Sequence, residues 1–241
     1  MAFSDPFELN YSKVRAYLNC PHLYSYIYLE RRYPPHTPFS SLGVSVHRAL
    51  DRFHSEGGGL EGLFLYYDEG WLNQGYDTPA RTLEFYGKGR GILENYWRAG
   101  QGGSGAEIIF TEKDFEFPFE RWRIRGTMDR VDRLASGGHE IIDYKMGFEP
   151  RTRGDLEKDL QLAIYAMALK RAFALEAASV SWVLLATGEK LSVPWDPSRE
   201  GAVLDLLRET GEKILALDLS RKGNCASCSI RKLCSQSEAK E

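Results

Sequence analysis

The sequence contains no apolar run of the length that a membrane-spanning helix requires. Such a helix needs about 20 consecutive apolar residues, and charged or polar residues interrupt every apolar stretch of this 241-residue chain well before that length. The first residues, MAFSDPFELNYSKVRAY, also lack the apolar segment of a secretory signal. We therefore expect a protein that has no membrane partner and that resides in the cytoplasm.

An excess of positive charge is also missing. The formal net charge is −3, which argues against a strongly basic, nonspecific nucleic-acid binder but allows a local basic groove. The sequence has no G-x4-G-K-[ST] element, so ATP-driven unwinding would have to come from another protein. Internal repeats and long low-complexity tracts are absent as well.

Cysteine is scarce, and its placement is informative. The four cysteines are Cys20 and a late group with the spacing C-x2-C-x5-C, formed by Cys225, Cys228 and Cys234. In a reducing compartment, clustered thiols hold a metal more often than they form disulfides. Four thiolates suit either a tetrahedral zinc ion or a 4Fe-4S cluster, and the spacing alone leaves both open.

The apolar pattern changes along the chain from helical to strand-like and back. Helices are predicted from residue 11 to about 32, from about 41 to 56 and over 60–100; strands follow over 107–144, then a helix over about 156–173, two strands within 180–195, and a helix over about 199–217. This order implies an α/β fold with a mixed sheet flanked by helices. We expect residues 1–105 to form a helical region and residues 106–241 a core with a cysteine-bearing tail.

The segment HEIIDYK combines a strand pattern with two charges. Alternation along a strand places Asp143 and Lys145 on the same face. Taken alone, the pair also fits an internal ion pair or an edge strand that is open to water. The preceding hairpin brings Asp129 or Asp132 near Asp143. Two converging carboxylates repel each other unless a cation lies between them, and magnesium prefers such oxygens. With a lysine alongside, the group suits phosphodiester hydrolysis.

Two helical features have both a structural and a functional interpretation. His47 lies next to the apolar stripe Val46, Leu50 and Phe53, where a histidine is usually structural. The many aromatic residues between 66 and 97 suit a protein core, although aromatic rings can also stack on unpaired bases.

Several segments, in the same order, resemble one known family. They are YLNCPHLYSY at 17–26, GVSVH at 43–47, GTMDRVD at 126–132, EIIDYKMG at 140–147, QLAIY at 161–165 and the cysteine tail at 225–234. This pattern is similar to the PD-(D/E)XK nucleases, specifically the RecB/AddB-like branch that includes the CRISPR-associated RecB-like exonucleases. The resemblance spans nearly the whole chain and implies a restriction-endonuclease-like fold.

The resemblance assigns roles to individual residues. It implies that Mg²⁺ or Mn²⁺ is bound by His47, Asp129, Asp143 and the carbonyl of Tyr144. Lys145 would be the catalytic lysine, and Gln161 and Tyr165 would form the QxxxY element near DNA and the active site. The resemblance also implies a 4Fe-4S cluster, with Zn²⁺ as the alternative, held by Cys20, Cys225, Cys228 and Cys234. One position departs from the family: Met146 stands where a serine or threonine is common.

The expected activity is therefore a metal-dependent DNA nuclease. We expect an exonuclease that acts on single-stranded DNA or DNA ends in repair, recombination or CRISPR adaptation, with a helicase or CRISPR adaptation proteins as partners. A catalytically silent DNA-binding module of the same fold is the main alternative, and an electron carrier or redox sensor is a second one. The candidates for DNA contact are Arg123, Arg125, Arg130, Arg151 and Arg153.

Overall fold

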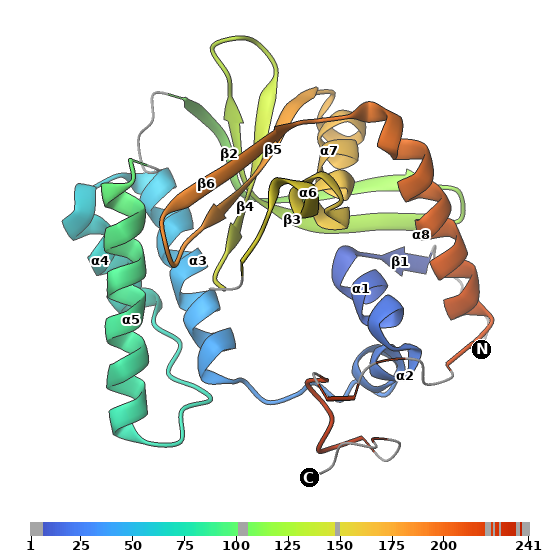
Figure 1. The fold of residues 1–241 in the computed structure, drawn as a ribbon, viewed down its shortest axis with the longest axis horizontal. Coiled ribbons are helices and arrows are strands. Elements are labelled where there is room, and N and C mark those ends of the chain that lie inside the picture. Colours follow the sequence, from blue (N-terminus) through green and yellow to red (C-terminus); the bar gives the residue numbers. More distant parts are fainter. Residues whose placement is uncertain are drawn as a thin grey trace. The chain divides into compact units, whose positions relative to one another are not determined.

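The computed structural model describes residues 7–100, 106–147, 150–219, 223, 225–226, 228–234 and 237 (Figure 1). The chain divides into two compact units, each built from separate segments. Unit 1 comprises Met1–Pro35, Glu116–Gly126 and Pro197–Glu241, and unit 2 comprises His36–Phe115 and Thr127–Asp196. The predicted division at residue 105 concerns regions of one nuclease domain, and it stays a prediction.

Three helices of unit 2 pack together: α3 (Pro38–Glu56), α4 (Gly59–Gly70) and α5 (Pro79–Arg98) (Figure 1). Helices α3 and α5 each begin with a threonine cap that is followed by proline. The Thr37 side chain accepts a hydrogen bond from the amide of Ser40, and Thr78 caps α5 in the same way. Such caps satisfy amides that have no partner within the helix. Among the described residues, no helix is long and apolar enough to cross a membrane.

The helix expected over 60–100 is in fact two helices. The chain leaves α4 at Gly70 and does not resume helical structure until Pro79. Gly75, in between, has a φ of 78° and lies so close to the carbonyl of His36 that a Cβ atom would be 2.4 Å from that oxygen. A residue with a side chain would therefore not fit this turn.

Within the described ranges of the chain, six strands form one mixed sheet. The order is β1-β3-β4-β5-β6, with β2 paired to β3. The β1–β3 and β4–β5 pairs are parallel, and the β3–β4 and β5–β6 pairs are antiparallel. This confirms the predicted α/β class with a mixed sheet; the three-residue strand β1 was not predicted. The strands are β1 (Phe7–Leu9), β2 (Glu107–Phe119), β3 (Trp122–Arg133), β4 (His139–Lys145), β5 (Ala177–Leu184) and β6 (Glu189–Pro194).

The two faces of strand β4 carry different kinds of side chain near its end. Ile142 and Tyr144 belong to the apolar cluster formed with α3, α4 and α5. Because successive strand residues point to opposite faces, Asp143 and Lys145 point the other way. Helix α7 (Leu160–Phe173) contacts β4 and β5, and the short helix α6 (Arg153–Glu157) contacts β5 and β6.

Unit 1 holds the remaining helices. Helix α1 (Tyr11–Asn19) packs on α8 (Glu200–Leu215), and the hydroxyl of Tyr17 donates a hydrogen bond of 2.7 Å to the carbonyl of Asp218. The helix expected from 11 to 32 is divided after Asn19, where Pro21 starts a new turn. The shorter helical segments are α2 (Pro21–Tyr24), the π-helical η1 (Ser25–Leu29) and the 3-10 turn η2 (Pro197–Arg199).

Candidate metal and catalytic site

The regular pairing of strands β3 and β4 ends next to Asp129 and Asp143, the two predicted metal-binding aspartates. Their register runs from Arg133↔His139 to Arg130↔Ile142. The next residue of β3, Asp129, uses its carboxylate instead: Oδ2 accepts a hydrogen bond of 2.8 Å from the backbone amide of Tyr144. Of the two aspartates expected near Asp143, it is therefore Asp129 that lies beside this end of β4.

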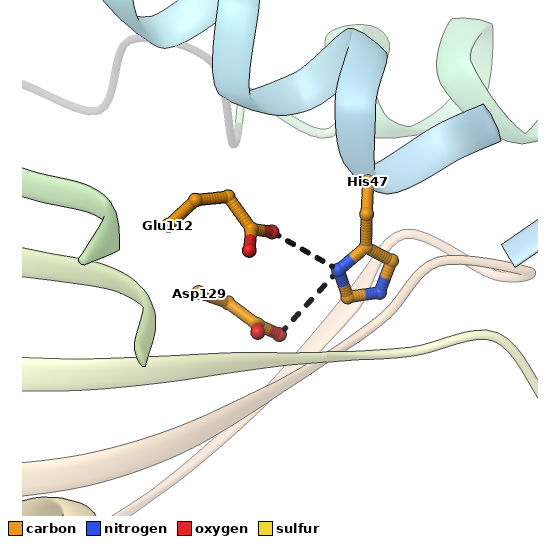
Figure 2. A group of neighbouring side chains, drawn as sticks. All are labelled: His47, Glu112 and Asp129. Atoms are coloured by element: carbon orange, nitrogen blue, oxygen red, sulfur yellow. Dashed lines mark hydrogen bonds and ion pairs between the residues drawn. The ribbon is translucent and has the colours of Figure 1, made fainter. Parts of the chain in front are cut away.

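Three potential metal ligands converge here from different elements. Nδ1 of His47, on α3, lies 3.4 Å from Oε1 of Glu112, on β2, and 3.9 Å from Oδ2 of Asp129 (Figure 2). Within the described part of the chain, these are the three side chains whose ligand atoms lie within 4.8 Å of one another. They adjoin a cavity of about 450 Å³, lined by Gly43, Val44, His47, Arg48, Asp51 and Glu112.

The electrostatics of this group reflect crowded negative charge. Burial, together with the charge of Asp143, raises the pKa of Asp129 to about 7. Burial also raises the pKa of Asp143, although Lys145 acts against this. Burial alone would lower the pKa of His47, but the hydrogen bond that the imidazole donates to Glu112 and the charges of Asp129 and Asp143 raise it to about 9. The carboxylates thus favour a positive charge among them.

Lys145 begins a polar chain that leads into helix α7. Its Nζ forms an ion pair with Oδ2 of Asp143 at 2.5 Å and donates a hydrogen bond of 2.9 Å to Oε1 of Gln161. Nε2 of Gln161 in turn donates to the hydroxyl of Tyr165 at 2.8 Å. Gln161 is near the start of α7, where the side chain of Asp159 caps the helix. The structure therefore brings together four of the five residues predicted to act in catalysis, and the fifth, Asp129, accepts a hydrogen bond from the amide of Tyr144.

Glu112 was not among the predicted site residues. The sequence offers only a weak signal, an acidic side chain within the strand EIIFTEKDF. The backbone is more informative, because Glu112 has a φ of 38°. A non-glycine residue with positive φ inside a strand is strained, and such strain is commonly found at functional sites.

Four of the predicted DNA-contacting arginines have accessible or half-buried side chains. Exposed Arg123 forms an ion pair with Glu116, and exposed Arg125 pairs with both Glu8 and Glu116. Arg153 is exposed at the first position of α6. Arg151 is half-buried, and its guanidinium carbon lies 5.0 Å from the centre of the Trp182 ring, which Nζ of Lys145 also approaches, to 5.9 Å. Arg151 is thus the arginine of this set with a ring contact in common with Lys145.

Arg130 differs from the expectation. Its side chain is only 3% exposed, and it forms a two-pronged ion pair with Asp132, in which both hydrogen bonds measure 2.6 Å. It also donates to the hydroxyl of Tyr96 at 3.0 Å. A guanidinium buried in this way is committed to the interior of unit 2, so we remove Arg130 from the candidates for DNA contact.

The four cysteines line one small cavity in unit 1. Cys20 lies just after α1, and the cavity also contains Cys225, Cys228 and Cys234. None of the four thiols is in a disulfide. Gly223 lies so close to this wall that a Cβ atom there would be 2.7 Å from Cβ of Cys20. The predicted convergence of an early cysteine with the late group is therefore present, in an arrangement that could surround a metal centre.

Comparison with known proteins gives a match to one family and similarity to solved structures. The family model described as PD-(D/E)XK nuclease superfamily matches residues 8–235. A crystal structure from Eubacterium rectale, described as a candidate exonuclease, is similar with a TM-score of 0.56 and 10% identity, over 92% of this chain and 86% of that chain. The structure of SSO0001 aligns with 19% identity over 80% of this chain and 84% of that chain, but its TM-score of 0.38 supports no conclusion. No curated protein matches the sequence.

Proposed function

The chain belongs to the PD-(D/E)XK nuclease superfamily, and on that basis we propose that it hydrolyses phosphodiester bonds of DNA with the help of a bound Mg²⁺ or Mn²⁺ ion. The observation that carries this proposal is the meeting of two groups at one end of β4. One group is the pair of ligands His47 and Asp129, and the other is the polar chain that starts at Lys145.

The residues fit a hard divalent cation. Carboxylate oxygens and an imidazole nitrogen are suitable donors for Mg²⁺ or Mn²⁺, and crowded carboxylates need a cation to offset their repulsion. His47 and Asp129 would hold the ion, with Glu112 as a further carboxylate and with Asp143 and the carbonyl of Tyr144 as the remaining predicted ligands. The bound ion would polarise the phosphate and lower the pKa of an attacking water.

The protein's own groups would position and stabilise the reacting atoms. Contacts with Asp143 and Gln161 fix the position of Nζ of Lys145. The ammonium group would therefore already be in position when the substrate binds. A cation fixed in this way stabilises the negative charge that develops on the phosphate oxygens. Tyr165 holds the amide of Gln161, which gives the QxxxY pair a positioning role.

For the cysteines, we propose a 4Fe-4S cluster rather than zinc. Four thiolates bound to one zinc ion at about 2.3 Å would be about 3.8 Å apart. In the described part of the chain, however, no three cysteine thiols lie within 4.8 Å of one another, although all four line the same cavity. The wider spacing supports a larger centre. A cluster at this place would agree with the RecB/AddB-like branch of the family.

Finer assignments extend the same proposal. We propose an exonuclease that acts on single-stranded DNA or DNA ends, consistent with the description of the Eubacterium rectale protein as a candidate exonuclease. A role in repair, recombination or CRISPR adaptation, a helicase or adaptation protein as partner, and a cytoplasmic location remain predictions from the sequence resemblance.

One experiment separates this proposal from a silent DNA-binding module. End-labelled single-stranded and duplex DNA is incubated with the protein in Mg²⁺, in Mn²⁺ and in a chelator. We expect degradation with either metal and intact DNA with the chelator. DNA that is bound but stays intact under all three conditions would show that the protein is a binding module and not a nuclease.

A further inference from the structure

A second cavity of unit 2 lies beside the residues that follow Lys145. Its volume is about 640 Å³, within the range of about 300–1,000 Å³ that is typical of small-molecule sites. Helix α3 contributes Phe39 and Leu42, helix α5 contributes Gly91 and Ile92, and the segment after β4 contributes Met146. None of these residues belongs to the metal site described above.

This cavity, which we call the α3–α5 pocket, adjoins the metal site. Gly43 lines the cavity of His47 and Glu112, and a Cβ atom at Gly43 would lie 3.7 Å from Cγ of Met146, which lines the α3–α5 pocket. The two cavities thus meet on either side of this contact. A strand that runs from the metal site across this contact would bring one of its nucleosides to the α3–α5 pocket.

The chemistry of the pocket suits a flat, mainly apolar group with a phosphate attached. Its walls include Leu42, Ile92 and Met146, and Phe39 at its edge is 64% exposed. An exposed aromatic ring is a platform on which a base can stack. Lys88 also lines the pocket, and its pair with Glu84 is exposed on both sides. Such a pair is weak, so the lysine can turn to a phosphate.

We propose that the α3–α5 pocket receives one unpaired nucleobase of the strand that is cleaved. The inference rests on the proposed nuclease function and adds to it a binding site for one base of the single-stranded substrate. A base inside a duplex is stacked and paired, and it must leave the helix before it can enter a pocket. The preferred substrate is therefore DNA that is single-stranded at the cleavage position, either a free strand or a frayed end.

The glycines of α5 offer a matched pair of variants. Gly91 lines the pocket, and Gly87 is exposed one turn earlier on the same helix; a Cβ atom at either position would meet nothing within 4 Å. Gly91→Trp places an indole at the pocket wall, whereas Gly87→Trp adds the same side chain outside it. Both remove a helical glycine, so both gain helix propensity.

Binding of a fluorescein-labelled oligothymidylate, measured by anisotropy with Ca²⁺ in place of Mg²⁺, tests the proposal. Gly91→Trp should raise the dissociation constant about tenfold or more, the scale of one lost base-stacking interaction, and Gly87→Trp should match the wild type. Equal affinities for the two variants would overturn the proposal. A single abasic position placed along the oligonucleotide should weaken wild-type binding at one register and have no effect on Gly91→Trp.

Two control measurements show whether Gly91→Trp weakens DNA binding by damaging the metal site rather than by filling the pocket. Gly91→Trp should retain the wild-type affinity for Mn²⁺ in calorimetry and the wild-type rate on bis(p-nitrophenyl) phosphate, which has no base. If either is lost, the comparison of Phe39→Ala with Leu83→Ala decides. Like Phe39, Leu83 is a large apolar residue that is exposed, with 71% of its surface accessible. It belongs to α5 and lies outside the pocket. Only Phe39→Ala should weaken oligonucleotide binding, and equal effects would reject the pocket.

The outcomes also distinguish this inference from the proposed function. If the wild type binds the oligonucleotide but never hydrolyses it with Mg²⁺ or Mn²⁺, the nuclease assignment fails, and the Gly91→Trp comparison still shows whether the pocket holds a base. If the wild type hydrolyses DNA and the two tryptophan variants bind and cleave equally, the nuclease assignment stands and the base pocket is wrong.

Discussion

The backbone amide of Tyr144 donates a hydrogen bond of 2.8 Å to the carboxylate of Asp129. This bond replaces a regular β3–β4 backbone pair just where β4 passes from Asp143 to Lys145. It fixes the carboxylate of one strand against the backbone of the next, so that Asp129 can face His47 while Lys145 points toward α7. The metal ligands and the lysine thus depend on one short piece of β4.

The first prediction concerns Lys145. Lys145→Ala removes the cation held by Asp143 and Gln161 and should slow DNA hydrolysis by roughly two to four orders of magnitude, the usual effect of losing a catalytic group. Affinity for DNA, measured by anisotropy, should change little. Lys170→Ala, at an exposed position near the other end of α7, serves as the control and should retain the wild-type rate. A Lys145→Ala variant of wild-type activity would remove the lysine from the mechanism.

A second prediction tests Glu112 as a metal ligand. Glu112→Gln removes one carboxylate charge beside His47 and should raise the Mn²⁺ dissociation constant about tenfold or more, since even partners that only orient the ligands contribute on this scale. Asp114→Asn is the matched control, two residues along β2, where the carboxylate accepts a hydrogen bond from Thr127. Calorimetry with Mn²⁺ measures both. Equal affinities would exclude Glu112 from the metal shell.

The fold of the site was predictable where the signal is local. The alternation of HEIIDYK along a strand places Asp143 and Lys145 on one face, and the spacing of four along a helix places Gln161 beside Tyr165; the structure has both arrangements. These relationships depend only on strand and helix geometry. The mixed sheet was predictable as well, because the order of helices and strands along the chain indicates this class of fold.

What was missed depends on contacts between distant segments. Nothing local in the sequence brings Glu112 of β2 to His47 of α3, because that approach requires the whole arrangement of unit 2. The burial of Arg130 also depends on the tertiary structure. Alternation along β3 places it on the same face as Met128, but Val131 on the opposite face is fully buried as well, so alternation alone does not distinguish an inward face from an outward one.

A third prediction concerns Arg151. This residue is half-buried over Trp182, its Nε is buried without a hydrogen-bond partner among the described residues, and the same ring lies near Lys145. If its guanidinium contacts a DNA phosphate, Arg151→Gln should weaken binding and reduce the slope of log affinity against log salt by about one. Arg98→Gln, which removes an exposed arginine paired with Glu94 on α5, should leave the slope unchanged. Identical slopes in all three proteins would exclude a phosphate contact.

A fourth prediction follows from His54. Burial lowers the pKa of this histidine to about 3, and the charge of Arg130 acts in the same direction. In the unfolded chain the imidazole has a pKa of about 6.5, so between these values the unfolded state binds one more proton than the folded state. The contribution of His54 to the free energy of unfolding should therefore fall as the pH is lowered below about 6.5, by up to about 1.4 kcal/mol per pH unit, while the raised pKa of Asp129 contributes in the opposite direction.

The variant His54→Gln isolates this contribution, because glutamine does not titrate and can still form a hydrogen bond with the hydroxyl of Tyr96, which lies 2.7 Å from Nε2 of His54. Urea unfolding at about pH 7 and about pH 5 should show a smaller loss of stability for the variant than for the wild type. The same loss in both proteins would mean that His54 is not the group responsible.

The last prediction concerns the cysteines. If Cys20 and the late thiols hold a 4Fe-4S cluster, anaerobically purified protein should be brown and contain about four irons per chain. Cys20→Ala should lose the colour and melt at a lower temperature, because metal binding at such a site is coupled to folding. Metal analysis and visible absorption measure the first effect, and calorimetry the second. A colourless protein with one zinc would refute the cluster and leave the nuclease assignment intact, whereas a Cys20→Ala variant that keeps its iron and its stability would remove Cys20 from the centre.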